Sequence, residues 1–143
     1  MRKRNQQRGS AFVEFALLAV LLSAGVTGAM SIGWNAYIYD ALVTRVTDGA
    51  RYASRLDCAG TSGVPGYESA VRNFIVYGNP AGGTSSTVPR LTTSNVIVNL
   101  DRTASPGLVT VSISGVSLGI GAMGSFTLIN RPSVTMSYAG YCF

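Results

Sequence analysis

The chain has 143 residues, of which 47% are hydrophobic and only 12% are charged, whereas an ordinary soluble domain is about 25% charged. This length holds one modest domain and one long helix, and the composition is typical of a membrane-associated or self-assembling protein. The net charge is +5, but four of the eleven basic residues precede Gly9. The remainder is nearly neutral, so no nucleic-acid partner is expected.

Residues 1–9 form a short basic leader that ends in Gly9. Its basic side chains are Arg2, Lys3, Arg4 and Arg8. Basic residues before the first apolar segment keep that end of a membrane protein in the cytoplasm. The leader resembles the start of a secretory signal peptide. However, the apolar run is not followed by a small-residue cleavage site with a polar mature sequence after it. We therefore expect an uncut anchor or a cut before the run.

Residues 10–34 are predicted to form the transmembrane or filament-core half of a long helix. They exceed the roughly 20 residues that span a bilayer, and Glu14 is their only charged residue. A charge at the centre of a spanning helix costs roughly 2.5–3.5 kcal/mol, so such residues usually have a partner or a task. Gly25, Gly28 and Gly33 either allow other helices to approach closely or are ordinary membrane-helix glycines.

Residues 35–57 are predicted to continue this helix, with an amphipathic pattern, to about Leu56. Apolar residues recur at spacings of three and four, which favours one buried stripe. The predicted stripe consists of Tyr39, Leu42, Val46, Gly49, Ala53 and Leu56. Trp34, Tyr37 and Tyr39 stand where an aromatic belt would meet the membrane surface. The whole helix would be close to 70 Å long.

Residues 58–143 are predicted to form a small α/β domain. After a Gly-rich loop from Asp57 to Gly66, a short helix is expected over Tyr67–Tyr77, with one apolar side. That side consists of Ala70, Val71, Phe74 and Ile75.

Alternating β-branched residues predict three strands in the rest of this domain. They are Asn95–Leu100, Leu108–Ser114 and Ser133–Tyr138, the first two forming a hairpin. Gly115–Gly124 is expected to be a Gly-rich connection. The fold class is therefore α+β: a long N-terminal transmembrane or assembly helix packed against a small antiparallel β-sheet domain.

Cys58 and Cys142 are the only cysteines, and the chain has no histidine, so zinc and CxxC redox motifs are not expected. In an oxidising compartment the two would form a disulfide, which would join the end of the long helix to the last residues. Two buried free thiols are the alternative.

An enzymatic function is not expected, and neither is a cofactor or a metal. General acid–base and nucleophilic catalysis use His, Cys, Lys or paired carboxylates. Here Lys3 is the only lysine, and the acids after the apolar segment are scattered along the chain.

The run Arg8-Gly9-Ser10-Ala11-Phe12-Val13-Glu14-Phe15-Ala16 resembles the processing motif of type IV pilins and pseudopilins. With Gly49-Ala50-Arg51-Tyr52-Ala53 and the β-rich C-terminal part, it is similar to TadE-like proteins of tight-adherence (Flp, type IVc) pilus systems. The resemblance implies a type IV pilin-like fold, cleavage between Gly9 and Ser10 by a prepilin peptidase, often with methylation, and filament assembly through Glu14 and Phe15.

The resemblance also implies the partners and the location. The partners would be copies of the chain or other pilins, the peptidase, an inner-membrane assembly platform and, before assembly, membrane lipid. The chain would span the bacterial inner membrane once, with its N-terminus in the cytoplasm, and then enter an extracellular pilus or a periplasmic pseudopilus. Major pilins of these systems are typically much shorter, so a minor pilin or pseudopilin is expected. The alternative is an uncleaved signal-anchored protein with an exported binding domain, which would gain nothing from Glu14.

Overall fold

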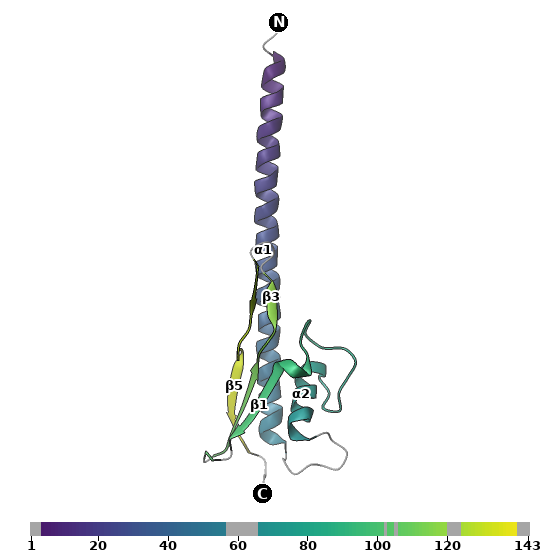
Figure 1. Cartoon of the computed structure of the whole chain (residues 1–143), viewed down its shortest axis with the longest axis vertical. Coiled ribbons are helices and arrows are strands. Elements are labelled where there is room, and N and C mark those ends of the chain that lie inside the picture. Colours follow the sequence, from purple (N-terminus) through teal and green to yellow (C-terminus); the bar gives the residue numbers. More distant parts are fainter. Residues whose placement is uncertain (1–3, 57–65, 102, 105, 120–123, 140–143) are drawn as a thin grey trace.

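One long helix runs the length of the molecule, and a small domain packs against its C-terminal part (Figure 1). The computed structural model describes residues 4–56, 66–101, 103–104, 106–119 and 124–139, with side chains from Gly9 onward. The described part of the chain begins at the bare end of the helix and ends at the domain end. The predicted α+β layout, a long helix with a small antiparallel sheet, is confirmed.

Helix α1 (Arg4–Arg55) has 52 residues, which at 1.5 Å per residue gives about 78 Å. It is long and apolar enough to cross a membrane. The prediction of one continuous helix is therefore confirmed at the level of the backbone. Its start is six residues earlier than expected, inside the proposed leader, where residues 4–8 contain no proline that would end a helix.

Helix α2 (Tyr67–Tyr77) has the predicted bounds. It ends at Gly78, which has a left-handed φ of 74° and donates its N–H to the carbonyl of Phe74 at 2.8 Å. Its buried residues are Ala70, Val71, Ile75 and Val76. The prediction placed Phe74 in this set instead of Val76. Phe74 lies half-buried at the side of the core, where its ring stacks on that of Tyr52 with centroids 4.5 Å apart.

The three predicted strands form one antiparallel sheet in the order β1-β2-β5. The strands are β1 (Val96–Asp101), β2 (Leu108–Ile113) and β5 (Ser133–Ser137), and a 3-10 turn, η1 (Thr93–Asn95), precedes β1. Val98, Val111 and Val134 are in register across the sheet. One face of the sheet packs on α1, while the other carries polar pairs such as Thr110 and Thr135, whose hydroxyl oxygens are 2.9 Å apart.

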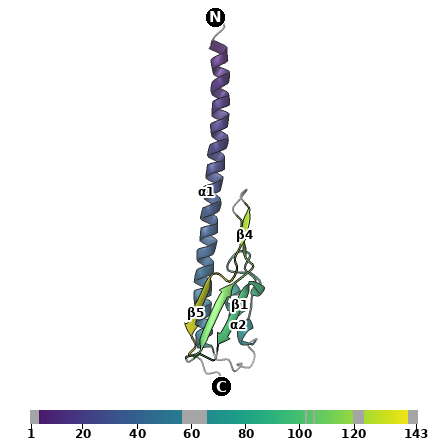
Figure 2. The same cartoon turned by 60° about the vertical axis from the view of Figure 1, so that its left-hand side comes forward.

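A second hairpin was not predicted. Strands β3 (Ser117–Gly119) and β4 (Ser125–Thr127) pair antiparallel, with Leu118 opposite Phe126. The hairpin leaves the main sheet and extends beside α1 toward the N-terminal half of that helix (Figure 2). The interpretation of Gly115–Gly124 as a plain connection was wrong, because strands of three residues are too short to show a clear alternation.

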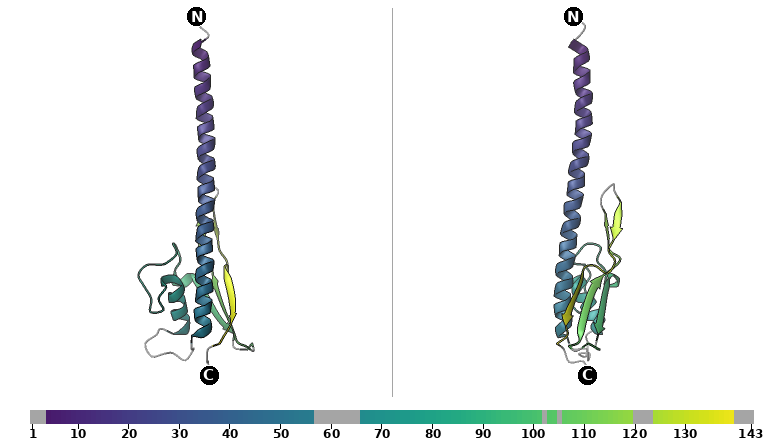
Figure 3. Two further views of the ribbon diagram at one scale, coloured as in Figure 1. Left: turned by 180° about the vertical axis from the view of Figure 1, so that it is seen from behind. Right: turned by 90° about the vertical axis from the view of Figure 1, so that its left-hand side faces the viewer.

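The core lies where α1 meets α2 and the sheet, and Figure 3 (left) shows α2 and β5 on opposite sides of α1. The buried stripe of α1 consists of Ile38, Leu42, Val46, Gly49, Ala50 and Ala53. The predicted stripe started one residue late: Tyr39 is 39% exposed, while Ile38 is 4% exposed. Ile38 lies four residues before Leu42, on the same helix face.

Candidate functional site: the uncovered half of the long helix

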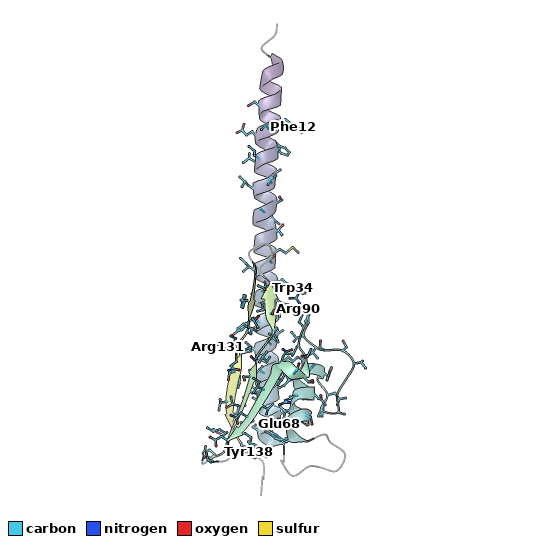
Figure 4. The ribbon with its side chains drawn as sticks, in the orientation of Figure 1. Phe12, Trp34, Glu68, Arg90, Arg131 and Tyr138 are labelled. Carbon is cyan, nitrogen blue, oxygen red and sulfur yellow. The ribbon has the colours of Figure 1, made fainter. Side chains whose placement is uncertain are left out.

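The N-terminal half of α1 projects from the domain as a bare apolar helix. Its large apolar side chains are between 53% and 77% exposed from Phe12 to Ile32, and Figure 4 shows Phe12 far from the packed domain. Monomeric soluble proteins rarely expose apolar patches larger than a few hundred Å². This exposed apolar surface is compatible with a membrane-spanning segment.

Four predicted site residues lie near the start of this bare segment. Gly9, Ser10, Glu14 and Phe15 are all exposed and belong to one uninterrupted helix. Ser10 and Glu14 are four residues apart, so they share one face of the helix. Within the described part of the chain, Glu14 takes part in no ion pair.

The three glycines of the apolar segment have no packing role within a single chain. A Cβ placed on Gly25, Gly28 or Gly33 would meet nothing within 4 Å. Gly49, farther along the same helix, behaves differently because its missing side chain is required for contact with α2. Both alternatives for the three membrane-segment glycines remain open.

The few hydroxyl groups of the apolar segment are bonded to the helix itself. The side chains of Ser23, Thr27 and Ser31 donate to main-chain carbonyls three or four residues earlier, at 2.8–2.9 Å. Such bonds satisfy hydroxyl groups locally, as an apolar surrounding requires. The segment can therefore enter lipid without leaving these groups unpaired.

Aromatic side chains mark the point where the domain begins to cover α1. Trp34 is 60% exposed and Tyr37 is 64% exposed, and their ring centroids are 5.8 Å apart. This position fits the predicted aromatic belt, since Trp and Tyr are enriched where a spanning helix meets water.

The polar groups of the domain do not converge on one site. Arg72 and Glu68 form an exposed ion pair at 2.9 Å. The pKa of the Asp101 carboxyl is lowered because the hydroxyl and N–H of Thr103 donate to it. Among the described residues, no three His, Cys, Asp or Glu side chains gather as metal ligands would.

Both cysteines, Cys58 and Cys142, lie outside the described residues, so their bridge stays a prediction. The described contacts nevertheless bring the two neighbouring segments together. The hydroxyl of Tyr138 donates to the Leu56 carbonyl at 2.7 Å, and the N–H of Ala139 donates to the Ser54 carbonyl at 2.9 Å. The end of β5 is thus held against the end of α1.

The contacts of the β3–β4 hairpin with α1 and with the loop before η1 were not predicted from the sequence. Asn35 donates its side-chain amide to the Gly119 carbonyl, and Arg90 donates to the Ser117 carbonyl at 3.2 Å. These bonds join the β3–β4 hairpin to α1 and to the loop before η1. A polar Asn35 directly after the apolar segment was a signal, but it indicates no partner by itself.

No protein-family model, curated protein or solved structure matches this chain.

Proposed function

We propose that the chain is a structural subunit of a type IV-like filament, a minor pilin or pseudopilin of the Tad/Flp kind. It is processed between Gly9 and Ser10, anchored in the inner membrane by α1 with its N-terminus in the cytoplasm, and then assembled with copies of itself or other pilins. The cleavage site and the Tad/Flp assignment rest on the sequence resemblance.

The observation that carries this proposal is the division of α1 into two halves. The domain buries one stripe of the C-terminal half, while the apolar N-terminal half projects bare from the same helix. A helix that is apolar all round is stable only inside lipid or among other helices. A filament subunit needs both surroundings in succession.

Glu14 supports assembly over simple anchoring. An anchor that stays in lipid gains nothing from a carboxylate there, because an unpaired charge in an apolar medium is costly. In a bundle of helices, Glu14 would pair with the positive N-terminal amine of a neighbouring subunit. Such a pair is favourable because each charge would otherwise lie unpaired.

Comparing the Glu14→Gln variant with the unchanged chain in the native host tests this role. We expect normal amounts of the variant in the membrane fraction. Its amount in the sheared filament fraction should fall at least roughly tenfold, because a tenfold change corresponds to about 1.4 kcal/mol of lost pairing. Glu68→Gln is the matched control, since it removes an exposed carboxylate already paired within the domain. Equal incorporation of the Glu14 and Glu68 variants would refute the role of Glu14 in assembly. Absence of the unchanged chain itself from the filament fraction would favour an uncleaved anchored protein with an exported binding domain.

A further inference from the structure

A narrow apolar groove lies between α1 and the β3–β4 hairpin. It has a volume of about 280 Å³ and is lined by Ile32, Asn35, Ala36, Tyr39, Leu118 and Phe126. Phe126 is 45% exposed although it lies on the groove side of its strand. The groove is open to the surroundings and nearly all its lining is carbon, so something apolar is expected to fill it.

The hairpin is fixed at the level where α1 would leave a bilayer. The apolar segment from Ala11 to Trp34 spans 24 residues, or about 36 Å, against a hydrocarbon core of about 30 Å. The bond from Asn35 to the Gly119 carbonyl holds β3 next to the end of this segment. Leu118 and Phe126 therefore stand at the boundary between hydrocarbon and headgroups.

A basic and an aromatic side chain stand at the same level. Trp34, Arg90 and Leu118 line a second hollow, of about 300 Å³, between α1, the loop before η1 and the hairpin. Figure 4 shows Trp34 and Arg90 close together where the domain begins. Trp occurs preferentially at the headgroup level, and Arg there gains from anionic headgroups. Asp40, the nearest acid on α1, is exposed and lies about 7.5 Å farther from the lipid than Asn35.

We propose that the β3–β4 hairpin is a lipid-contacting foot of the C-terminal domain. Phe126 contacts the upper acyl chains of the leaflet on the side of the domain, supported by its buried cross-strand neighbour Leu118, and the Arg90 guanidinium binds lipid phosphate. This proposal rests on the membrane-anchored state of the proposed function. It adds a second membrane contact, which must break when the subunit leaves the bilayer.

The continuity of the apolar surface favours lipid over a second protein copy. Ile32 belongs to the bare half of α1, is 59% exposed and lines the groove together with Phe126, so lipid around that half of the helix would also meet the groove. A helix of another copy is about 10 Å wide with its side chains, whereas the groove accommodates only a few carbon groups. Arg90 also matches phosphate groups better than an apolar helix face.

Single-tryptophan fluorescence of the full-length protein in vesicles tests the foot. The chain has one tryptophan, Trp34, so Trp34→Phe combined with Phe126→Trp places the probe on the hairpin. The vesicles contain phosphatidylcholine and phosphatidylglycerol, with acyl chains brominated near the headgroup. We expect the probe at position 126 to lose as much fluorescence as Trp34 does in the unchanged chain.

Ile97→Trp in the same Trp34→Phe background is the matched control, since Ile97 is similarly exposed, at 42%, on β1 of the same domain. We expect no quenching there. If Trp34 is quenched but the probe at position 126 is not, the hairpin does not contact lipid, while α1 is still anchored in the membrane. If neither probe is quenched, both the lipid contact of the hairpin and the membrane anchoring of α1 are refuted. A probe at 126 that is blue-shifted only at high protein-to-lipid ratios would show that another copy fills the groove, and would also overturn the proposal.

Adding Arg90→Gln to the Trp34→Phe, Phe126→Trp protein tests the phosphate contact. We expect replacement of phosphatidylcholine by phosphatidylglycerol to increase quenching with Arg90 present and to have no effect in the variant. Arg55→Gln is the control, because Arg55 is exposed at the opposite end of the domain. An unchanged response in Arg90→Gln would contradict the role of Arg90. These fluorescence results are independent of whether Gly9 is cleaved.

Discussion

Gly49 of α1 lies directly against the side chain of Ile75 of α2. A Cβ at Gly49 would overlap Cγ1 and Cδ1 of Ile75, and both residues are buried. The two helices can therefore approach closely only because residue 49 is glycine. This contact gives a physical role to one residue of the Gly49–Ala53 run.

Gly49→Ala is expected to destabilise the domain. Overpacking a core costs typically about 1–3 kcal/mol, and the better helix propensity of alanine offsets about 1 kcal/mol of that. We expect a net loss of up to about 2 kcal/mol, measured by urea unfolding of the detergent-solubilised protein with near-ultraviolet circular dichroism. Gly28→Ala, which meets open space, is expected to show no loss. Combining Ile75→Ala with Gly49→Ala tests the contact further, because the double variant should lose less stability than the sum of the two single losses.

Tyr138→Phe is expected to weaken the closure of β5 against α1. The Tyr138 hydroxyl donates to the Leu56 carbonyl at 2.7 Å, and its ring meets that of Tyr67 edge-on. Losing one such hydrogen bond costs about 1 kcal/mol. Hydrogen exchange of the β5 amides should accelerate correspondingly. Tyr37→Phe, at an exposed position, should change nothing; equal effects from both variants would refute the assigned contact.

Leu42→Ala and Leu18→Ala are expected to separate folding from assembly. Leu42 is fully buried, whereas Leu18 is 53% exposed in the single chain. Truncating a buried leucine costs about 2–5 kcal/mol, so only Leu42→Ala should lower the unfolding midpoint of the solubilised protein. A comparable shift from Leu18→Ala would show that the bare half of α1 packs within the single chain.

Asp101 is expected to titrate below its ordinary pKa. The Thr103 hydroxyl and N–H stabilise the ionised form, so the folded pKa lies below the unfolded one. The stabilisation is present above the unfolded pKa of about 3.9 and is lost as the pH falls through the folded pKa. Carboxyl NMR should show this shift, and Thr103→Val should reduce it. An unchanged titration in Thr103→Val would exclude the hydroxyl as a cause.

The sequence predicted the elements with strong periodicity. The C-terminal half of the long helix, α2 and the three strands of the main sheet appear near their expected bounds because each has a period of 3.6 or 2. The N-terminal half of the long helix was recognised from the length of its apolar run. The short strands β3 and β4 were missed because three residues cannot establish a period. Tyr39 was misplaced because a large aromatic residue fits a stripe as well as its neighbour Ile38 does.

The candidate site was likewise predicted in part: its local features were recognised, and its contacts between distant residues were not. The apolar segment and Glu14 could be recognised from local composition, and the structure shows that both are exposed in the single chain. The hydrogen bond from Asn35 to Gly119 connects residues that are 84 positions apart in the sequence. No local pattern indicates such a contact. The close approach at Gly49 likewise depends on a residue in another helix.

Intact mass with N-terminal sequencing of the protein from its native host, beside a Gly9→Leu variant, shows whether the chain is processed as a pilin. We expect a mature chain in filaments that starts at Ser10, with or without one added methyl group. The Gly9→Leu variant should keep its leader and stay in the membrane. A working protein that still starts at Met1, with Gly9→Leu unaffected, would exclude a processed pilin and favour a membrane-anchored binding domain.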